Sequence, residues 1–409
     1  MNVLFVSLID FKSLNDRNIY TDLMRMFVKN GHQLYVISPT EKKNNQPTRI
    51  YRDKVQIEEK DWTAVILKPQ IGNIQKNGYV EKAISMFTLD GILKRAIKHY
   101  WNKVKFNLIL YPTPPITITE VVHYVKKRDG AKTYLLLKDI FPDGTIDLGV
   151  LSTRGWRGML YRYYKSVEKK LYDNSDFIGC MSPANCQYVL SHTPKVDKNK
   201  VEICPNSVEP LDNSCDKATR ARLRVKYGIP ENTTVFVYGG NLGQPQGISF
   251  FIDCLQRVQS RRDAFFLIVG DGTEFRKIEE YISSSMQKNV KLLRRLPKKD
   301  YDKMIGSCDI GMIFLDHRYL IPNFPSRLLS YMQAKMPVLA VTDPNTDLGT
   351  IIEKEDFGWW CESNDVEAFS QKVAEALASD LKIMGQNAWD VLVKKYNVKD
   401  AYQTIIKHI

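Results

Sequence analysis

Several features that would place the chain in a familiar class are missing from its 409 residues. No apolar run approaches the length of about 18 residues that a membrane-spanning helix needs. The first residues run directly into an apolar segment without a basic stretch or cleavage pattern, so we expect a buried first strand and not a signal peptide. The seven cysteines include no Cys-x-x-Cys pair. This pattern indicates a reducing compartment and argues against a zinc site or a disulfide framework.

Signatures of nucleic-acid binding, such as a helix-turn-helix, a zinc finger, an RRM or a KH motif, are also missing. The formal net charge is nevertheless +13, and it is unevenly distributed. Residues 1–210 hold 32 Lys and Arg against 21 Asp and Glu, whereas residues 211–409 hold 27 against 25. A basic half of this kind suits an anionic membrane surface or an anionic substrate.

What is present is a regular alternation of short apolar runs with helical patterns. In the first half, apolar runs predict strands at residues 3–8, 33–38, 64–67, 108–111, 133–137 and 177–181. A second series follows the turn-rich residues 205–216, with strands predicted at 233–238, 265–269, 290–293, 310–314 and 338–341. Continuous Val, Ile and Leu runs are typical of parallel strands covered on both faces. The sequence therefore predicts two Rossmann-like, doubly wound α/β halves joined near residue 210.

Glycine-rich loops follow successive predicted strands of the second half. The first contains Gly239, Gly240 and Asn241, and the next contains Gly270 and Asp271. Glycine lets backbone N–H groups approach a phosphate, and a following helix N-terminus adds about half a positive charge. A tight strand-to-helix turn is the alternative explanation for each loop. Neither loop matches the dinucleotide fingerprint, which argues against an NAD or FAD oxidoreductase.

A third polar loop, which contains Arg318, leads into another helical pattern. Ser326 is a residue type suited to capping this helix, and Arg327 lies in its first turn, where an anion is favoured. Three successive loops with chemistry that suits phosphate indicate a phosphate-binding site in the second half.

Taken in order, these motifs resemble glycosyltransferase family 4. They are Pro205-Asn206-Ser207-Val208, Gly239-Gly240-Asn241-Leu242, Val269-Gly270-Asp271-Gly272-Thr273, Ser307-Cys308-Asp309-Ile310-Gly311 and the segment 325–338. The resemblance implies a GT-B fold, in which two Rossmann-like domains face each other across a cleft. Residues 1–207 would bind the acceptor and residues 208–394 the nucleotide-sugar. The last helix, from about residue 395 to 409, would pack back on the first domain.

The resemblance also implies a metal-independent reaction with retention at the anomeric carbon. The residues that it places around the donor are Gly239, Gly240 and Asn241 at the diphosphate, Gly270 and Asp271 near the nucleotide, Arg295 or its neighbours along the base, and Ser326 with Arg327 at the phosphates.

The sequence departs from the family pattern at this site. Pro322 and Ser330 stand where many members carry two glutamates, the second of which contacts the ribose. Asn241 and Gln246 stand where many members carry an arginine and a lysine that neutralise the diphosphate.

A departing nucleoside diphosphate needs a positive partner in the transition state. Arg327 is our first candidate for that partner, Arg318 the second and Lys335 a distant third. A solvated arginine at the start of a helix is the alternative explanation for Arg327.

In the first half, Asp139 follows a predicted strand within a segment that resembles the Asp-Leu-Trp-Pro type found in related sugar transferases. Asp139 is the candidate for orienting or deprotonating an acceptor hydroxyl. A carboxylate that caps a helix or closes a loop is the alternative.

Residues 154–172 form a helical pattern with six basic residues and one acidic residue. Trp156, Arg157, Arg162 and Lys165 are the side chains that we expect at an anionic lipid surface. The alternative is an amphipathic surface helix whose aromatic side chains pack inward.

We therefore expect a bacterial glycosyltransferase that moves a sugar from a nucleoside-diphosphate sugar to a lipid-linked or polysaccharide acceptor in capsule, O-antigen or other envelope polysaccharide synthesis. It would act in the cytoplasm, peripherally on the inner face of the plasma membrane, without a metal or another cofactor and without nucleic acid. One alternative is a nucleotide-sugar 2-epimerase on the same fold, which would not need the basic helix. Another is a non-catalytic nucleotide-sugar sensor or scaffold, which the departures at the donor site favour.

Overall fold

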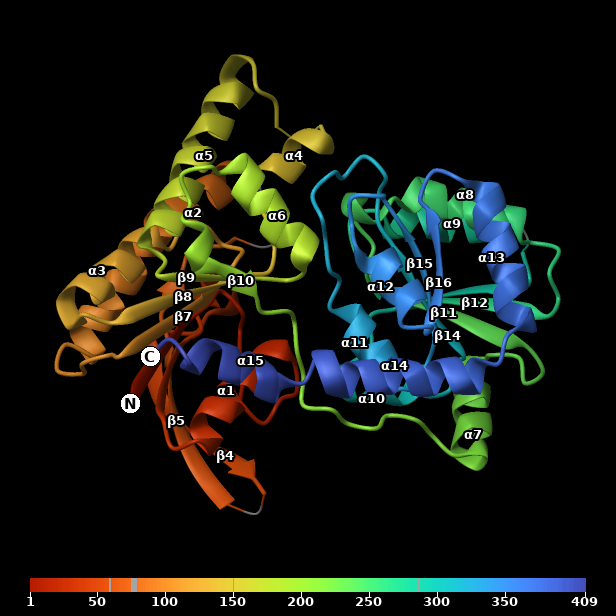
Figure 1. Cartoon of the computed structure of the whole chain (residues 1–409), viewed down its shortest axis with the longest axis horizontal. Helices are drawn as coiled ribbons and strands as arrows, with labels where there is room; N and C mark the ends of the chain where they lie inside the picture. Colours follow the sequence, from red (N-terminus) through yellow and green to blue (C-terminus); the bar gives the residue numbers. More distant parts are fainter. Residues whose placement is uncertain (59, 75–78, 150, 286) are drawn as a thin grey trace. The chain divides into compact units, whose positions relative to one another are not determined.

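The computed structural model describes residues 1–58, 60–74, 79–149, 151–285 and 287–409. It divides into two compact units (Figure 1). Unit 1 comprises Met1–Glu209 and Val398–Ile409, and unit 2 comprises Pro210–Asn397. Both are α/β structures around largely parallel sheets, which confirms the prediction of two Rossmann-like halves. Of the helices in these described ranges, none is long and apolar enough to cross a membrane.

Unit 1 is built on one large, twisted sheet. Its strands are β1 (Asn2–Val6), β2 (Gln33–Ile37), β4 (Arg49–Ile57), β5 (Lys60–Lys68), β7 (Leu108–Pro112), β8 (Lys132–Leu137), β9 (Phe177–Cys180) and β10 (Val201–Ile203). They lie in the order β10-β9-β8-β7-β1-β2-β5-β4. All neighbours are parallel except β4, which pairs antiparallel with β5. A separate short pair is formed by β3 (Thr40–Glu41) and β6 (Gln70–Ile71).

Helices cover both faces of this sheet. They are α1 (Ile19–Lys29), α2 (Tyr79–Tyr100), α3 (Thr119–Asp129), α4 (Asp143–Asp147), α5 (Gly155–Asn174), α6 (Pro183–His192) and α15 (Val398–Ile406). The apolar sides of α1 and α15 share one hydrophobic core with the central strands, and α3 packs against α2 and α5 on the other side (Figure 1). The helix α1 begins where the Asn18 side chain accepts the N–H groups of Tyr20 and Thr21 at 2.9 and 3.0 Å.

The last helix, α15, belongs to unit 1 although unit 2 precedes it in the chain. The Tyr402 hydroxyl on α15 lies 2.9 Å from Nε2 of His32, and the Tyr402 ring meets Phe27 edge-on at 5.0 Å. Glu202 of β10 pairs with Lys407 at 2.7 Å. These contacts hold the C-terminal residues on the first unit.

Unit 2 contains a fully parallel sheet. Its strands are β11 (Thr234–Asn241), β12 (Ala264–Asp271), β13 (Val290–Arg294), β14 (Ile310–Phe314), β15 (Val338–Thr342) and β16 (Gly358–Glu362). They lie in the order β13-β12-β11-β14-β15-β16. The helices are α7 (Lys217–Tyr227), α8 (Ile248–Arg257), α9 (Phe275–Ser285), α10 (Lys298–Ile305), α11 (Arg327–Gln333), α12 (Leu348–Lys354), α13 (Val366–Ala378) and α14 (Leu381–Lys395). A core of aromatic and aliphatic side chains lies between the sheet and α8, α9 and α13.

A buried arginine fixes the start of the central strands of unit 2. Arg224 on α7 donates through Nη1 to three carbonyls of the connection to β11, at 2.8 to 3.1 Å. Its Nη2 pairs with Asp309 at 2.6 Å, and Asp309 also accepts the N–H of Val235 at 2.8 Å. The Ser307-Cys308-Asp309 motif therefore has a structural role here, because Asp309 ties α7 to the beginnings of β11 and β14.

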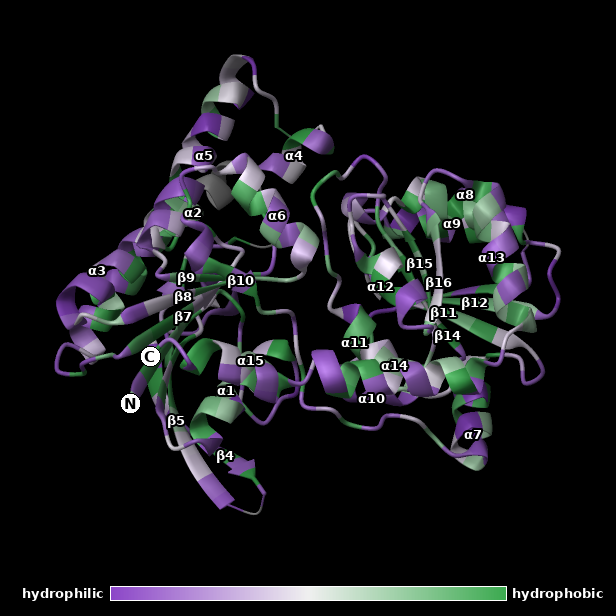
Figure 2. Cartoon of the chain, viewed as in Figure 1, coloured by the Kyte–Doolittle hydropathy of each residue, from purple (hydrophilic) through white to green (hydrophobic). Residues whose placement is uncertain are grey.

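The sequence prediction omits β3, β4, β6, β10 and β16 and shortens β5. Figure 2 shows that the central strands of both sheets are mainly hydrophobic, whereas β4 mixes hydrophilic and hydrophobic residues. Most side chains of β4 are exposed or only partly buried, so its sequence lacks the pattern of a core strand. The strand β4 is stabilised by its antiparallel ladder with β5, which runs from Arg49 opposite Lys68 to Ile57 opposite Lys60.

Candidate active site

Two glycine-rich loops of unit 2 meet at one edge of its sheet. The predicted loop residues Gly239, Gly240 and Asn241 are the last residues of β11, and Gly270 and Asp271 are the last residues of β12. The two strands are parallel neighbours, so these ends lie together. The ladder places Gly240 opposite Gly270 and Asn241 opposite Asp271. A Cβ at Gly270 would lie 2.0 Å from the Gly240 carbonyl oxygen, and Gly240 has a φ of +134° that favours glycine. The close approach of the two backbones therefore requires these two glycines.

Arg327, the first residue of α11, places its guanidinium against β11. Its Cζ atom lies 4.5 Å from the centre of the Tyr238 ring, and a Cβ at Gly240 would lie 3.3 Å from it. The Nη1 atom is shielded from solvent and has no hydrogen-bond partner. Within the described ranges, Arg327 forms no ion pair. A solvated arginine at a helix start is therefore not what the structure shows.

The side chains around Arg327 do not balance its charge. The Tyr331 hydroxyl accepts the N–H of Gly239 at 3.1 Å and donates to the Met312 carbonyl at 3.1 Å. Burial raises the pKa of the Tyr238 and Tyr331 phenols, although the nearby Arg327 charge opposes the shift. Both phenols are thus neutral at physiological pH. Arg327 is partly buried, and its shielded Nη1 atom lies among neutral phenols. A shielded positive charge without a counter-ion is unfavourable.

Asn241 and Gln246, which replace the basic residues of the family pattern, bind each other. The Asn241 Nδ2 donates to Oε1 of Gln246 at 2.9 Å, and the same oxygen accepts the N–H of Gly243 at 3.1 Å. The Tyr238 hydroxyl donates to the Asn241 carbonyl at 2.7 Å. This neutral network fixes the loop and adds no positive charge, which leaves Arg327 as the cation nearest to Gly240.

Arg318, the second candidate, already has a counter-ion. Its Nε and Nη2 atoms donate to the two carboxylate oxygens of Asp316 at 2.9 and 2.7 Å. Burial of Asp316 favours the neutral acid, yet the Arg318 guanidinium holds the pKa of that carboxyl below its ordinary value. Because its charge is balanced inside the loop, Arg318 is a poorer partner for a diphosphate than Arg327.

At the outer end of the β12 ladder, Asp271 accepts the N–H of Gly272 at 3.0 Å and pairs with Arg294 at 3.5 Å. The Arg294 guanidinium also lies 3.7 Å above the centre of the Phe275 ring. The sequence prediction named Arg295 or its neighbours, and among these the structure places Arg294 against Asp271. The register that puts Arg294 opposite Gly270 is the signal that distinguishes it from Arg295.

Ser326, which precedes Arg327, does not cap α11 as predicted. Ser326 precedes α11, but its side chain makes no capping hydrogen bond, so the expected cap is wrong. The reason is its backbone, which is already helical at φ −63° and ψ −16°, whereas a side-chain cap needs an extended residue. Ser330 lies one turn further along the seven-residue helix.

In unit 1, Asp139 follows β8 at the carboxyl edge of the sheet. Thr113, just after β7, closes this loop: its hydroxyl donates to the Asp139 carbonyl at 2.8 Å and accepts the N–H of Lys138 at 3.1 Å. Burial, with a smaller contribution from the Asp139 carboxylate, raises the pKa of Tyr20 to about 12. The Asp139 side chain itself is exposed, and it lies near the start of α1.

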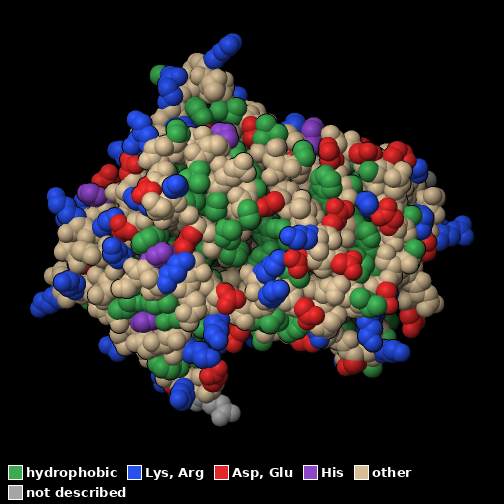
Figure 3. Space-filling model, viewed as in Figure 1, with side chains coloured by type: hydrophobic (Ala, Val, Ile, Leu, Met, Phe, Trp, Pro, Cys, Tyr) green, Lys and Arg blue, Asp and Glu red, His purple; other side chains and the backbone are tan. Residues whose placement is uncertain are grey.

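The first turns of α5 carry exposed apolar side chains. Trp156 is 68% exposed and Met159 is 62% exposed, and the Arg157 guanidinium lies 5.5 Å from the Trp156 ring centre. Figure 3 shows Lys, Arg and hydrophobic side chains together at this end of α5. Arg162 is also exposed. Lys165 differs, because it pairs with Asp143 at 3.1 Å and Glu168 at 2.5 Å within the unit.

The part of the chain that carries this site is similar to known proteins. Residues 219–390 match the family model "Glycosyl transferases group 1", a segment within unit 2 that includes both glycine-rich loops and Arg327. The probable glycosyltransferase WbjE of Pseudomonas aeruginosa is 25% identical over 297 residues, which are 71% of each chain. The putative colanic acid biosynthesis glycosyl transferase WcaI of Escherichia coli K12 is 22% identical over 275 residues, which are 66% of each chain.

Solved structures share the fold over nearly the whole length. The sucrose-phosphate synthase tll1590 of Thermosynechococcus elongatus superimposes with a TM-score of 0.75 at 14% identity and covers 100% of this chain and 98% of its own. Anabaena Alr3699/HepE, solved in complex with UDP and glucose, gives a TM-score of 0.68 at 14% identity, with 100% and 99% covered. The chain has the GT-B fold, and the comparisons together support a glycosyltransferase.

Proposed function

We propose that the protein transfers a sugar from a nucleoside-diphosphate sugar to an acceptor, and that unit 2 binds the donor with Arg327 at its diphosphate. One observation carries this proposal: among the described residues, the partly shielded Arg327 cation has no anionic partner, and its guanidinium lies beside Gly240 at the end of β11. A diphosphate would supply the missing counter-ion. The same contact would stabilise the charge that develops on the departing nucleoside diphosphate.

The remaining donor contacts follow from the edge of the sheet. Gly239, Gly240 and Asn241 would bring backbone groups to the diphosphate, and Gly270 with Asp271 would approach the nucleoside. Arg294, a neighbour of the predicted Arg295, pairs with Asp271 on the same side. Because HepE is solved with UDP and glucose, a UDP-sugar is the first donor to test. The proposal includes no metal ion or other cofactor.

For the acceptor, we propose Asp139 as the residue of unit 1 that orients or deprotonates the attacking hydroxyl. Its support is its exposed position at the carboxyl end of β8, where ligands of doubly wound sheets bind. Retention at the anomeric carbon and membership of glycosyltransferase family 4 rest on the sequence resemblance. An acceptor in envelope polysaccharide synthesis rests on the named role of WcaI in colanic acid biosynthesis.

We also propose that the first turns of α5 contact the cytoplasmic face of an anionic membrane. Trp156 and Met159 supply exposed apolar area, and Arg157 and Arg162 supply charge. Lys165 is left out of this surface because Asp143 and Glu168 already balance it.

The test is incubation of the full chain with a panel of nucleotide sugars, with and without a lipid extract of bacterial membranes. Nucleoside diphosphate released only when extract is present supports transfer. Donor binding without turnover in every condition would instead identify a sensor or scaffold. Conversion of the donor to an isomer without extract would identify an epimerase.

A further inference from the structure

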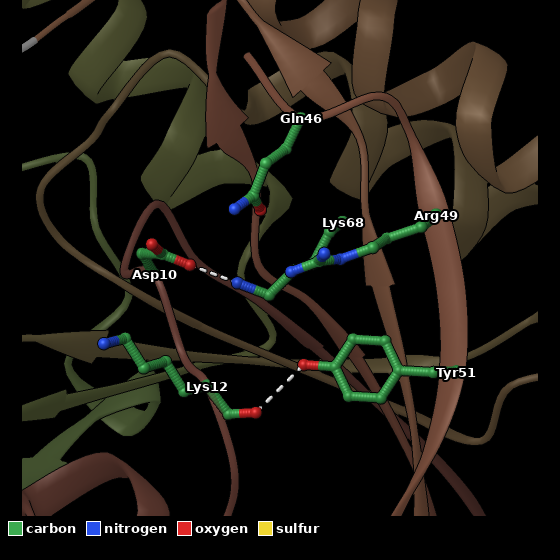
Figure 4. A pocket seen from close by; sticks show the side chains of 6 residues that line it. All are labelled: Asp10, Lys12, Gln46, Arg49, Tyr51 and Lys68. Carbon is green, nitrogen blue, oxygen red and sulfur yellow. Dashed lines mark hydrogen bonds and ion pairs between the residues drawn. The ribbon is translucent and has the colours of Figure 1, made fainter. Parts of the chain in front are cut away.

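Unit 1 contains a cavity that the donor site does not use. Its volume is about 490 Å³, and it is lined by Asp10, Lys12, Gln46, Arg49, Tyr51 and Lys68 (Figure 4). Asp10 and Lys12 follow β1, Lys68 ends β5, and Arg49 and Tyr51 lie on β4. The cavity thus lies at the carboxyl ends of parallel strands, the edge at which doubly wound sheets bind ligands. Asp139, after β8, is at the same edge of the sheet.

The lining carries three cations and one carboxylate. The Lys68 ammonium pairs with Asp10; the Lys68 side chain is 3% exposed and that of Asp10 is 50% exposed. Neither Lys12 nor Arg49 forms an ion pair within the part of the chain that the structure describes. Two positive charges on exposed side chains therefore face the cavity, and neither has a counter-ion among the described residues.

The position of Arg49 places an exposed second cation beside the buried Lys68. The β4–β5 ladder places Arg49 directly opposite Lys68, and like charges at opposite positions of an antiparallel pair repel each other. Figure 4 shows the Arg49 side chain reaching from β4 toward Lys68, whose ammonium meets Asp10. Since Asp10 balances only one of the two cations, an anion in the cavity would relieve the repulsion.

The backbone around the cavity is held in place. The Tyr51 hydroxyl donates to the Lys12 carbonyl at 3.1 Å. Two positions further along β4, on the same face, Asp53 accepts the N–H of Leu14 at 2.7 Å. These bonds fasten the loop after β1 to β4, so the backbone that carries Lys12 is held beside the strand that carries Arg49.

We propose that this cavity binds the phosphate or diphosphate group of a phosphorylated acceptor. A phosphate carries about −1.5 to −2 charges at pH 7, which matches the two unbalanced cations. The planar Arg49 guanidinium suits two phosphate oxygens, and Lys12 and Lys68 bind as point charges. The volume exceeds that of a phosphate and lies in the range of about 300–1,000 Å³ typical of ligand sites, so part of the attached sugar or lipid also fits. The assignment to an acceptor rests on the proposed function, whereas the binding of phosphate does not.

The experiment measures binding of inorganic pyrophosphate to the full chain by calorimetry, with Arg49→Gln as the test variant. The matched control is Arg52→Gln, which removes the same charge from an exposed residue on the opposite face of β4. Arg327→Met separates this cavity from the donor site. We expect one binding event that Arg327→Met retains, that Arg49→Gln weakens about tenfold or more, and that Arg52→Gln leaves unchanged.

Equal weakening by Arg49→Gln and Arg52→Gln, or no pyrophosphate binding to the Arg327→Met variant, would overturn the proposal. Competition then identifies the source of the phosphate. Displacement of pyrophosphate by a soluble hexose phosphate supports a free sugar phosphate as acceptor, and displacement only by a detergent-dispersed polyprenyl diphosphate sugar supports a lipid-linked one. If neither compound displaces pyrophosphate, the assignment to an acceptor is refuted. None of these measurements depends on turnover. A failure of the phosphate-binding proposal can therefore be distinguished from a failure of the transferase proposal.

Discussion

Arg327 is expected to lower the stability of the protein when no donor is bound. An unsatisfied buried polar group costs about 1–3 kcal/mol, and the Nη1 atom of Arg327 is such a group. Its contact with the Tyr238 ring returns about 0.5–2 kcal/mol. Arg327→Met removes both contributions and keeps the length of the side chain. We therefore expect the variant without ligand to be more stable by about 1 kcal/mol, which raises Tm by about 2–4 °C for a domain of this size.

The donor should reverse this order. At a UDP concentration of about 100 times Kd, binding stabilises the native protein by about 2.7 kcal/mol. Loss of a charged hydrogen bond worth about 1.5–3 kcal/mol raises Kd roughly 10- to 100-fold. At the same UDP concentration, the stabilisation of Arg327→Met then falls to about 0.4–1.4 kcal/mol. The variant is thus the more stable form without ligand, and with UDP it becomes less stable than wild type by about 0.3–1.3 kcal/mol.

The assay is thermal unfolding with and without UDP, together with turnover of the sugar donor. Arg327→Lys serves as the control, because it keeps the charge but loses the planar fork, and an intermediate UDP effect is expected. If Arg327→Met unfolds more easily than wild type by 2 kcal/mol or more (about 4–8 °C), the residue is structural. If the full UDP shift persists in this variant, Arg327 is not at the diphosphate.

Three further predictions follow from other parts of the structure. Trp156→Ser should weaken sedimentation with phosphatidylglycerol vesicles, whereas Val225→Ser, at an exposed apolar residue of α7, should not; equal effects would contradict the proposed membrane surface. Asp139→Asn should lower kcat about 100-fold or more, as for loss of a general base, with UDP binding unchanged, and retained turnover would remove Asp139 from the mechanism. Arg224→Ala should lower the free energy of unfolding by about 1–3 kcal/mol, because three carbonyls lose their donor while Asp309 keeps its ion pair with Arg220, and a change below about 0.5 kcal/mol in urea unfolding would refute that role.

The two-domain α/β form was predictable from the sequence because most of its signal is local. Buried parallel strands are continuous apolar runs bounded by turns, and each run can be recognised without knowledge of its neighbours. The glycine-rich loops were found in the same way, since glycine marks a close backbone approach wherever it occurs. Gly240 and Gly270 confirm this reasoning at the residue level.

Charge balance was not predictable, because it depends on which residues meet. Arg318 and Arg327 look alike in the sequence, yet Asp316 neutralises the first and only tyrosines surround the second. Lys165 matches the basic pattern of its helix, but Asp143, distant in the chain, pairs with it.

The sequence by itself determined the order of strands and helices, the two-unit organisation and the loops that carry the candidate donor site. Only the tertiary structure decided that β4 exists, since its stability comes from the ladder with β5 and not from its own hydrophobicity. The strand β4 also places Arg49 opposite Lys68 in the ladder and forms one wall of the basic cavity of unit 1. The physical reason is that an apolar pattern depends only on residues that are neighbours in the sequence. An electrostatic partner depends on which charged residues the fold brings close together.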